Sequence, residues 1–445
     1  MTSESKDGMT VAVARTADGE SRLVDALVFV LPLLQFVQVK LVGTLLASDV
    51  LFVAVFICLV LRHNIRLSSP LARTFVTLCS LWFASQCLTD VMRNSAFADF
   101  ARGWSKILLT LVNFSVLHAF LYGRSRRILL YGWGLVVGSV LLYFINPYFL
   151  AIDHPWKNGM ALPTTMAVFL AASHPKCRGV WPALFGVAIG IANILGDARS
   201  RGGVCLAVCA YLASIAAWQR RGCPPVRINF KNIVLASGVA AISVTLIIWV
   251  YGYAAEAGML GERAQEKYQV QASGKLGVLL GGRSDVLGAF AAIYDSPLLG
   301  HGSWAKDPLY VLLDLQMMAQ LGYENTVDME RELVENEFRI PAHSYLLEAW
   351  VEAGVAGALF WGWIAFLTLR VLVRFYPARV GFVPLAGFVA FTLLWDIAFT
   401  PYGQQDRLFV PYYVVVLLTC LGTSTVGYLP DRLQGMTPVR PIFQG

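Results

Sequence analysis

Long apolar segments separated by short polar ones make up most of the chain. A helix that crosses the hydrocarbon core of a membrane needs about 20 mostly apolar residues. That criterion predicts twelve membrane spans, with eleven or thirteen as alternatives, because the first, sixth, seventh and eighth segments are short. The predicted spans are residues 23–39, 41–61, 71–89, 105–122, 128–146, 160–173, 180–196, 202–218, 232–251, 343–369, 381–400 and 408–428.

The spans divide the chain into five parts. A polar tail covers residues 1–22, and the first nine spans fill 23–251. A loop at 252–342 is the one long polar interruption; three spans at 343–428 and a tail at 429–445 follow. The first apolar run continues into the second span without a convincing cleavage site, so we expect a transmembrane helix there and not a removed signal peptide. The predicted fold is an all-α membrane protein.

Basic residues are concentrated in alternate loops. The loops after even-numbered spans carry 15 Arg and Lys residues and no Asp or Glu. Cytoplasmic loops of membrane proteins have this excess of positive charge. The alternation predicts that both termini are cytoplasmic and that the long loop faces the opposite side of the membrane, towards a periplasm or the exterior.

Composition agrees with a membrane protein. Hydrophobic residues make up 57% of the chain and charged residues 14%, against about 25% charged in soluble proteins. The net charge of +7 does not indicate a nucleic-acid surface, because the long loop has 13 acidic and 7 basic residues. The helical spacing of apolar positions in this loop predicts three helices, at 284–294, Tyr310–Leu321 and Thr326–Phe338.

Four arginines lie on the predicted outer side of the membrane, where the positive-inside pattern does not account for them. They are Arg199, Arg201, Arg283 and Arg407. A guanidinium is always charged and matches phosphate oxygens with two parallel hydrogen bonds, so converging arginines would bind a diphosphate. The alternative is that each pairs with a neighbouring acid, such as Asp197.

Histidine supplies the candidate base. His343 starts the tenth predicted span, where the nearby helix N-terminus favours the neutral imidazole. Glu348 and Glu352 are four residues apart and share a helix face. His301 lies in a glycine-flanked turn and is a weaker candidate. The alternative for His343 is a helix-capping or interfacial side chain. We treat the other four histidines as structural: His63, His118, His154 and His174.

Known motifs for metal or nucleotide chemistry are missing from the sequence. It has no phosphate-binding glycine loop with Lys, no His-Glu-x-x-His and no Asp-x-Asp on a predicted outer loop. The eight cysteines contain no Cys-x-x-Cys pair and none falls in residues 281–354. We therefore expect no metal and no cofactor, and an activated donor other than a nucleotide.

Three motifs resemble the bacterial O-antigen ligase and polymerase superfamily. Ser200-Arg201-Gly202 is similar to its Ser-Arg-Gly turn at the start of a span. Gly282-Arg283-Ser284 and Pro297-Leu298-Leu299-Gly300-His301-Gly302 resemble its Gly-Arg and Pro-Leu-x-Gly-x-Gly loop segments. His343-Ser344-x-x-Leu347-Glu348 resembles its His-Asn/Ser-x-x-Leu signature. Together the motifs extend over about half of the chain.

The resemblance implies a metal-independent, inverting glycosyltransferase. Its donor is a glycan on undecaprenyl diphosphate, bound by Arg201 and Arg283, with Arg199 as the alternative arginine. His343 activates the acceptor hydroxyl. Supporting roles fall to Glu348, Glu352, His301 and Arg407. Membrane lipids and a chain-length regulator protein are further partners that it implies.

Two acceptors are possible for an enzyme of this class. A ligase transfers the glycan to lipid A–core in lipopolysaccharide biosynthesis, and a polymerase transfers it to another lipid-linked repeat unit of an O-antigen or exopolysaccharide. We favour the ligase-like function because the arginine–histidine set matches it. A lipid-linked saccharide transporter is the alternative from another class, although the candidate charges lie at one boundary and not at the midplane. A sensor with a signalling loop has less support.

Overall fold

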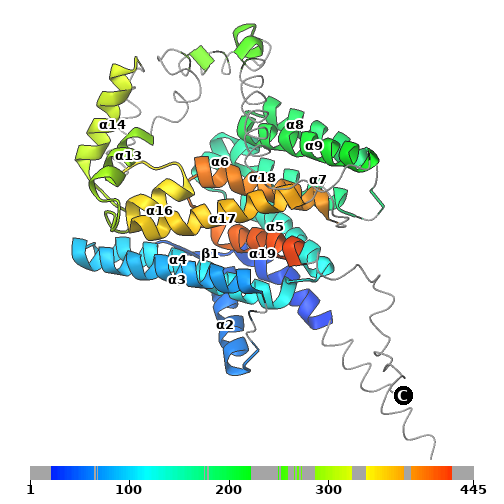
Figure 1. Cartoon of the computed structure of the whole chain (residues 1–445), viewed down its shortest axis with the longest axis horizontal. Helices are drawn as coiled ribbons and strands as arrows, with labels where there is room; N and C mark the ends of the chain where they lie inside the picture. The colour runs from blue at the N-terminus through cyan, green and yellow to red at the C-terminus, as the bar shows by residue number, and fades with distance from the viewer. Residues whose placement is uncertain are drawn as a thin grey trace, which may run out of the picture.

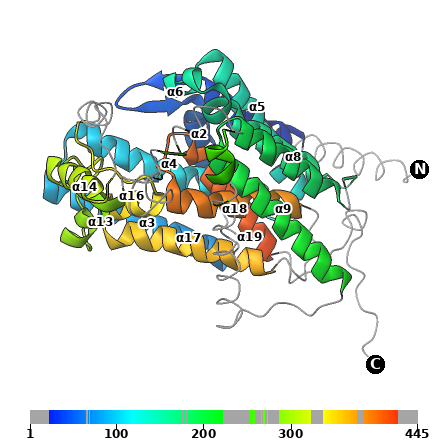
Figure 2. The same cartoon turned by 90° about the horizontal axis from the view of Figure 1, so that it is seen from above.

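A computed structural model describes most of the chain, and it is almost entirely helical (Figures 1 and 2). The one sheet in its described part is a two-stranded antiparallel hairpin. The described residues are 22–64, 67, 69–174, 176–177, 180–221, 249, 252–258, 265, 268–269, 272, 286–322, 337–374 and 382–422.

Five helices in the described ranges are long and apolar enough to cross a membrane. The five stretches are α3 (Pro70–Arg93), α4 (Phe97–Leu121), α5 (Ser125–Ile145), the part Arg199–Trp218 of α9 (Arg199–Arg220) and the part Val355–Val373 of α17 (Val355–Arg374). Shorter apolar helices accompany them: α2 (Ala47–Leu61), α8 (Trp181–Leu195) and α18 (Val383–Phe399). These helices indicate an α-helical membrane protein, while the count of twelve spans stays a prediction.

Helix α19 (Asp406–Gly422) forms the centre of the bundle. Every residue from Arg407 to Leu421 is buried, as expected for a helix that is apolar on all sides. It packs against α4, α5, α17 and α18. Figures 1 and 2 show α3 and α4 side by side with α17 next to α3, while α8 and α9 lie beyond α18.

The N-terminal part differs from the two predicted spans at 23–39 and 41–61. Residues 22–33 are helical, and the 3-10 turn η1 (Leu34–Phe36) ends that helix. Strands β1 (Gln38–Lys40) and β2 (Thr44–Leu46) then form a hairpin in which Gln38 pairs with Leu46. The hairpin satisfies its backbone groups across the strands, so the first apolar run is interrupted before α2 begins.

Helix α7 (Ala161–Ala172) matches the predicted segment 160–173 closely. The structure adds two short elements in the preceding loop, α6 (Phe149–Asp153) and the π-helical turn η2 (Pro155–Met160). Trp156 of η2 donates from Nε1 to Asn193 Oδ1 of α8 at 3.1 Å, which fixes the turn to the bundle.

Two of the three helices predicted in the long loop are present. They are α13 (Val286–Asp295) and α14 (Pro308–Gln320), and Asp307 caps α14 by accepting from Leu309 N at 2.9 Å. Residues 323–336, which hold most of the third, and nearly all of the predicted ninth span at 232–251 lie outside the described residues, as do the tails 1–21 and 423–445.

The predicted tenth span at 343–369 is two helices. Helix α16 (Tyr345–Ala353) ends at Gly354, whose φ of 65° and ψ of −155° are open almost only to glycine. A Cβ added at Gly354 would stand 2.1 Å from the Leu298 carbonyl oxygen, so the loop packs directly on this break. Nine residues are too few to cross a bilayer, and the membrane-crossing part is therefore α17.

Candidate active site at the loop end of the bundle

Ser344 fixes the start of α16 against the end of α18. Its Oγ accepts from Leu347 N at 3.1 Å, which caps α16, and donates to Ile397 O at 2.7 Å. Ser344 is buried, whereas His343 directly before it is exposed. The cap therefore holds the His343 backbone beside the C-terminal end of α18 and leaves its side chain at the surface.

Arg201 reaches the same end of α18 from the first turn of α9. Its guanidinium interacts electrostatically with the Asp396 carboxylate, whose Oδ1 also accepts from Thr400 Oγ1 at 2.9 Å. Burial raises the pKa of the hydroxyl of Tyr148, which precedes α6, and the charge of Arg201 opposes that shift. Asp396 and Ile397 are consecutive, so two residues singled out in the sequence, Arg201 and His343, lie at one helix terminus.

Asp396 and Asp406 are site carboxylates that the sequence reasoning missed. Asp406, at the start of α19, accepts from Gly403 N at 2.6 Å and hydrogen-bonds Tyr345. It also repels Asp396 electrostatically. A signal was present, because Asp396 is an acid within an apolar run, and an ionisable residue in a span marks a functional site by default.

Glu348 and Glu352 are both buried in an ion cluster, the Lys106 cluster, formed with Lys106 and Arg339. Lys106 Nζ lies 3.0 Å from Glu348 Oε1 and 2.7 Å from Glu352 Oε2. Arg339 lies 3.0 Å from the same Glu348 oxygen. The other two oxygens accept from the backbone amides of Tyr402, at 2.9 Å, and Trp304, at 3.1 Å. Each carboxylate oxygen has a partner, so both residues anchor α16 to α4.

Lys106 and Arg339 are further residues that the sequence reasoning passed over. Lys106 is the one Lys or Arg in the predicted span 105–122, and such a charge needs a buried partner. The Arg339 guanidinium lies 3.8 Å from the centre of the Trp304 ring, and Arg102 approaches that ring at 5.5 Å. These contacts place the long loop on the N-terminal part of α4.

His301 belongs to the turn that docks on the α16–α17 break. Its backbone N–H donates to Val351 O at 2.7 Å, and Gly302 N–H donates to Glu352 O at 3.0 Å. The ring Nε2 lies 2.8 Å from Ala292 O, and the ring meets Tyr310 edge-on at 5.1 Å. His301 therefore packs against other residues of the long loop.

Arg199 and Arg407 each form an ion pair with an acid. Arg199 Nε lies 3.0 Å from Asp197 Oδ1, which is the pairing considered as its alternative. Arg407 is buried and lies 2.9 Å from Asp49 Oδ2, while it also donates to Thr44 O at 2.9 Å. Arg201 is therefore the better placed of the two arginines at the start of α9 for binding a ligand. Arg283 lies outside the described residues.

No protein-family model matches the chain, and no curated protein matches it either. The assignment of a function therefore depends on the motifs and on the geometry described above.

Proposed function

We propose that the protein is an O-antigen ligase-like glycosyltransferase, which moves a glycan from undecaprenyl diphosphate to a sugar acceptor at the periplasmic face of the inner membrane. The main support for this proposal is that Arg201 and His343 both approach one end of α18. A fixed cation and an imidazole near a membrane boundary are what transfer from a lipid diphosphate requires.

Arg201 binds and stabilises the leaving group. A guanidinium has five N–H donors, so the interaction with Asp396 leaves donors for phosphate oxygens and helps to orient them. Negative charge develops on the diphosphate as the bond from its oxygen to the anomeric carbon breaks, and a positioned cation lowers the energy of that state. Arg283 is the second cation that the resemblance implies.

His343 is the base in this scheme. Its neutral imidazole takes the proton of the acceptor hydroxyl while the hydroxyl oxygen forms a bond to the anomeric carbon. The electron pair of the broken bond leaves with undecaprenyl diphosphate, and the configuration inverts. The ordered cap at Ser344 positions the base, and the Lys106 cluster holds the helix that carries that cap.

Purified protein in vesicles, supplied with undecaprenyl-diphosphate-linked repeat units, tests the proposal. Mass spectrometry follows the glycan with and without lipid A–core. Glycan on lipid A–core identifies a ligase, and chain growth without lipid A–core identifies a polymerase. An intact donor in both reactions would refute glycosyl transfer, and movement of that donor across the bilayer without cleavage would identify a transporter.

A further inference from the structure

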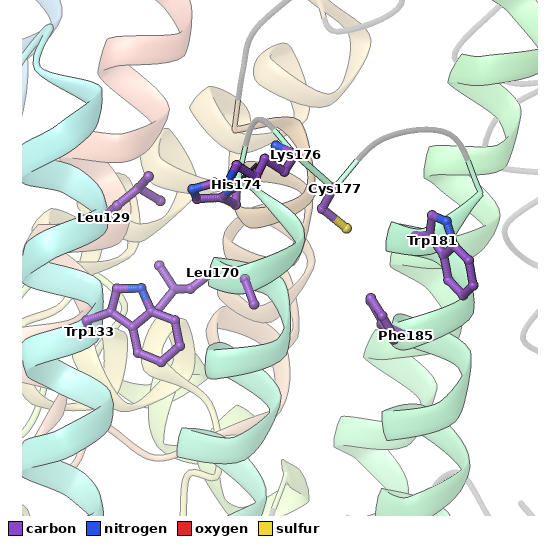
Figure 3. Close-up of a pocket in the computed structure, with 9 residues that line it drawn as sticks. Leu129, Trp133, Leu170, His174, Lys176, Cys177, Trp181 and Phe185 are labelled. Atoms are coloured by element: carbon purple, nitrogen blue, oxygen red, sulfur yellow. Dashed lines mark hydrogen bonds between the residues drawn. The ribbon is translucent and has the colours of Figure 1, made fainter.

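A groove opens between α5, α7 and α8, at the other end of α8 from the candidate active site (Figure 3). Trp181 begins α8, whereas Arg199 and Arg201 follow its far end. The groove is therefore separate from the candidate active site. It has a volume of about 570 Å³, within the range of pockets that hold small ligands.

The walls of the groove are apolar and open to the surroundings. Trp133 of α5 is 37% exposed, and Trp181 and Phe185 of α8 are 57% and 47% exposed. The Trp181 and Phe185 rings stack with their centres 5.9 Å apart, and Leu170 of α7 also lines the groove. An exposed aromatic wall on a membrane protein is suited to an acyl chain, and tryptophan is enriched at the membrane–water interface.

The mouth of the groove carries positive charge and hydrogen-bond donors. Figure 3 shows His174 and Lys176 together between α5 and α8. Lys176 N–H donates to His174 Nδ1 at 3.3 Å, so a neutral ring carries its proton on Nε2, where it is a donor. Ser173 fixes the position of His174, because its Oγ accepts from Leu385 N at 3.0 Å and donates to Phe169 O at 2.9 Å.

We propose that this groove binds one anionic phospholipid of the cytoplasmic leaflet. The acyl chain lies on the wall formed by Trp133, Trp181 and Phe185, and the phosphate binds Lys176 and the Nε2–H of His174. Basic sites between helices at the cytoplasmic side bind anionic lipid headgroups in this way. Charge complementarity at the mouth selects an anionic lipid over a zwitterionic one with the same chains. This site is independent of the proposed glycosyl transfer.

Native mass spectrometry of the purified full chain in detergent tests the site. Dioleoyl phosphatidylglycerol and dioleoyl phosphatidylcholine are added separately at equal concentrations. We expect one phosphatidylglycerol molecule to stay bound to the protein at higher occupancy than phosphatidylcholine. Lys176→Gln should lower its occupancy roughly five-fold, because one cation near a lipid headgroup contributes about that factor, and should leave phosphatidylcholine unchanged.

Two further variants make the result specific. Lys40→Gln removes an exposed cation from strand β1 and should change neither lipid. Ala171→Trp fills the groove from α7 and should remove the bound phosphatidylglycerol. Equal retention of both lipids by the unchanged protein would overturn the proposal. Unchanged phosphatidylglycerol occupancy in Lys176→Gln or in Ala171→Trp would also overturn it.

Discussion

Lys106 on α4 and Glu352 on α16 form an ion pair inside the bundle, with Nζ 2.7 Å from Oε2 and both side chains less than a tenth exposed. The pair joins residues 246 positions apart in the chain. Glu348 on the same face of α16 binds the same ammonium. Because Ser344 and His343 directly precede α16, the Lys106 cluster determines where the candidate base is held.

Lys106→Met should destabilise the protein strongly. The substitution removes the buried ammonium that both carboxylates share and leaves only the partly exposed Arg339 beside them, and breaking a buried ion pair in this way costs about 3–5 kcal/mol. The midpoint of thermal unfolding in detergent should fall. Lys157→Met is the matched control: Lys157 is partly exposed, lies 3.8 Å from Asp197, and should change stability by about 1 kcal/mol or less.

A combined variant separates charge from packing. Lys106→Met together with Glu348→Gln and Glu352→Gln removes all three buried charges and leaves only the partly exposed Arg339, so much of the lost stability should return. A triple variant no more stable than Lys106→Met would show that the cation contributes through its side-chain packing.

Gly354→Ala should destabilise the junction of α16 and α17 by about 1–3 kcal/mol or more, because the added Cβ would meet the Leu298 carbonyl in a conformation that other residues avoid. Gly362 is exposed within α17, and a Cβ there would meet nothing within 4 Å. Gly362→Ala should therefore stabilise the helix by about 0.5–1 kcal/mol. Unfolding midpoints of equal value for the two variants would contradict the tight approach at Gly354.

Arg201→Lys should lower glycosyl transfer by about 10²–10³-fold, because lysine keeps the charge but loses the planar set of donors. Arg199→Lys is the matched control. Its side chain already pairs with Asp197, and transfer should stay within about three-fold of the unchanged protein, the scale of a surface ion pair. Initial rates with undecaprenyl-diphosphate-linked glycan distinguish the two, and a larger loss in Arg199→Lys would reverse the assignment.

The ion pairs of Lys306, with Glu337 in the same loop and with Asp99 of α4, should be constant between about pH 5 and pH 10. Hydrogen bonding to Lys306 lowers the pKa of Glu337 below its ordinary 4.5, so this contribution is full above pH 4.5 and is lost as the pH falls through the lowered value. Burial lowers the pKa of Lys306, but its bonds to Glu337 and Asp99 raise it overall above 10.5. That contribution is full below pH 10.5 and is lost as the pH rises through the raised value.

A spin label at residue 338, in a cysteine-depleted chain, becomes more mobile when these ion pairs of Lys306 are lost. We expect one spectrum from pH 6 to pH 9 and a more mobile label in strong acid. Lys306→Gln should mobilise the label at every pH, because it removes the contact of 2.9 Å with Asp99. A change in mobility between pH 6 and pH 8 would point to a different titrating group.

The helical bundle could be predicted from the sequence because apolar length alone specifies a span. Helices α3 and α5 begin and end within a few residues of the predicted 71–89 and 128–146, apart from a longer C-terminal end of α3. The break at Gly354 could not be predicted in this way. The Leu298 carbonyl, which leaves no room for a Cβ at Gly354, belongs to the long loop, and the residues directly beside Gly354 are apolar.

The candidate site could also be predicted only in part, because local periodicity can be read from the sequence and packing between distant helices cannot. A helical period places Glu348 and Glu352 on one face, and both do bind one cation. Nothing local identifies that cation as Lys106, because the pairing depends on how α4 packs against α16. The approach of Arg201 to Asp396 likewise depends on the packing of α9 against α18.

The ion pair between Asp49 and Arg407 has a consequence for how the protein is made. Asp49 is fully buried near the start of α2, and its partner is synthesised about 360 residues later, which is about 20–70 s at ordinary rates of translation. Until then the Leu46 N–H is the local donor to the Asp49 carboxylate. A chain that stops before α19 lacks Arg407 and keeps Asp49 without its cation. Loss of the last helix therefore destabilises the start of α2, one of the first helices.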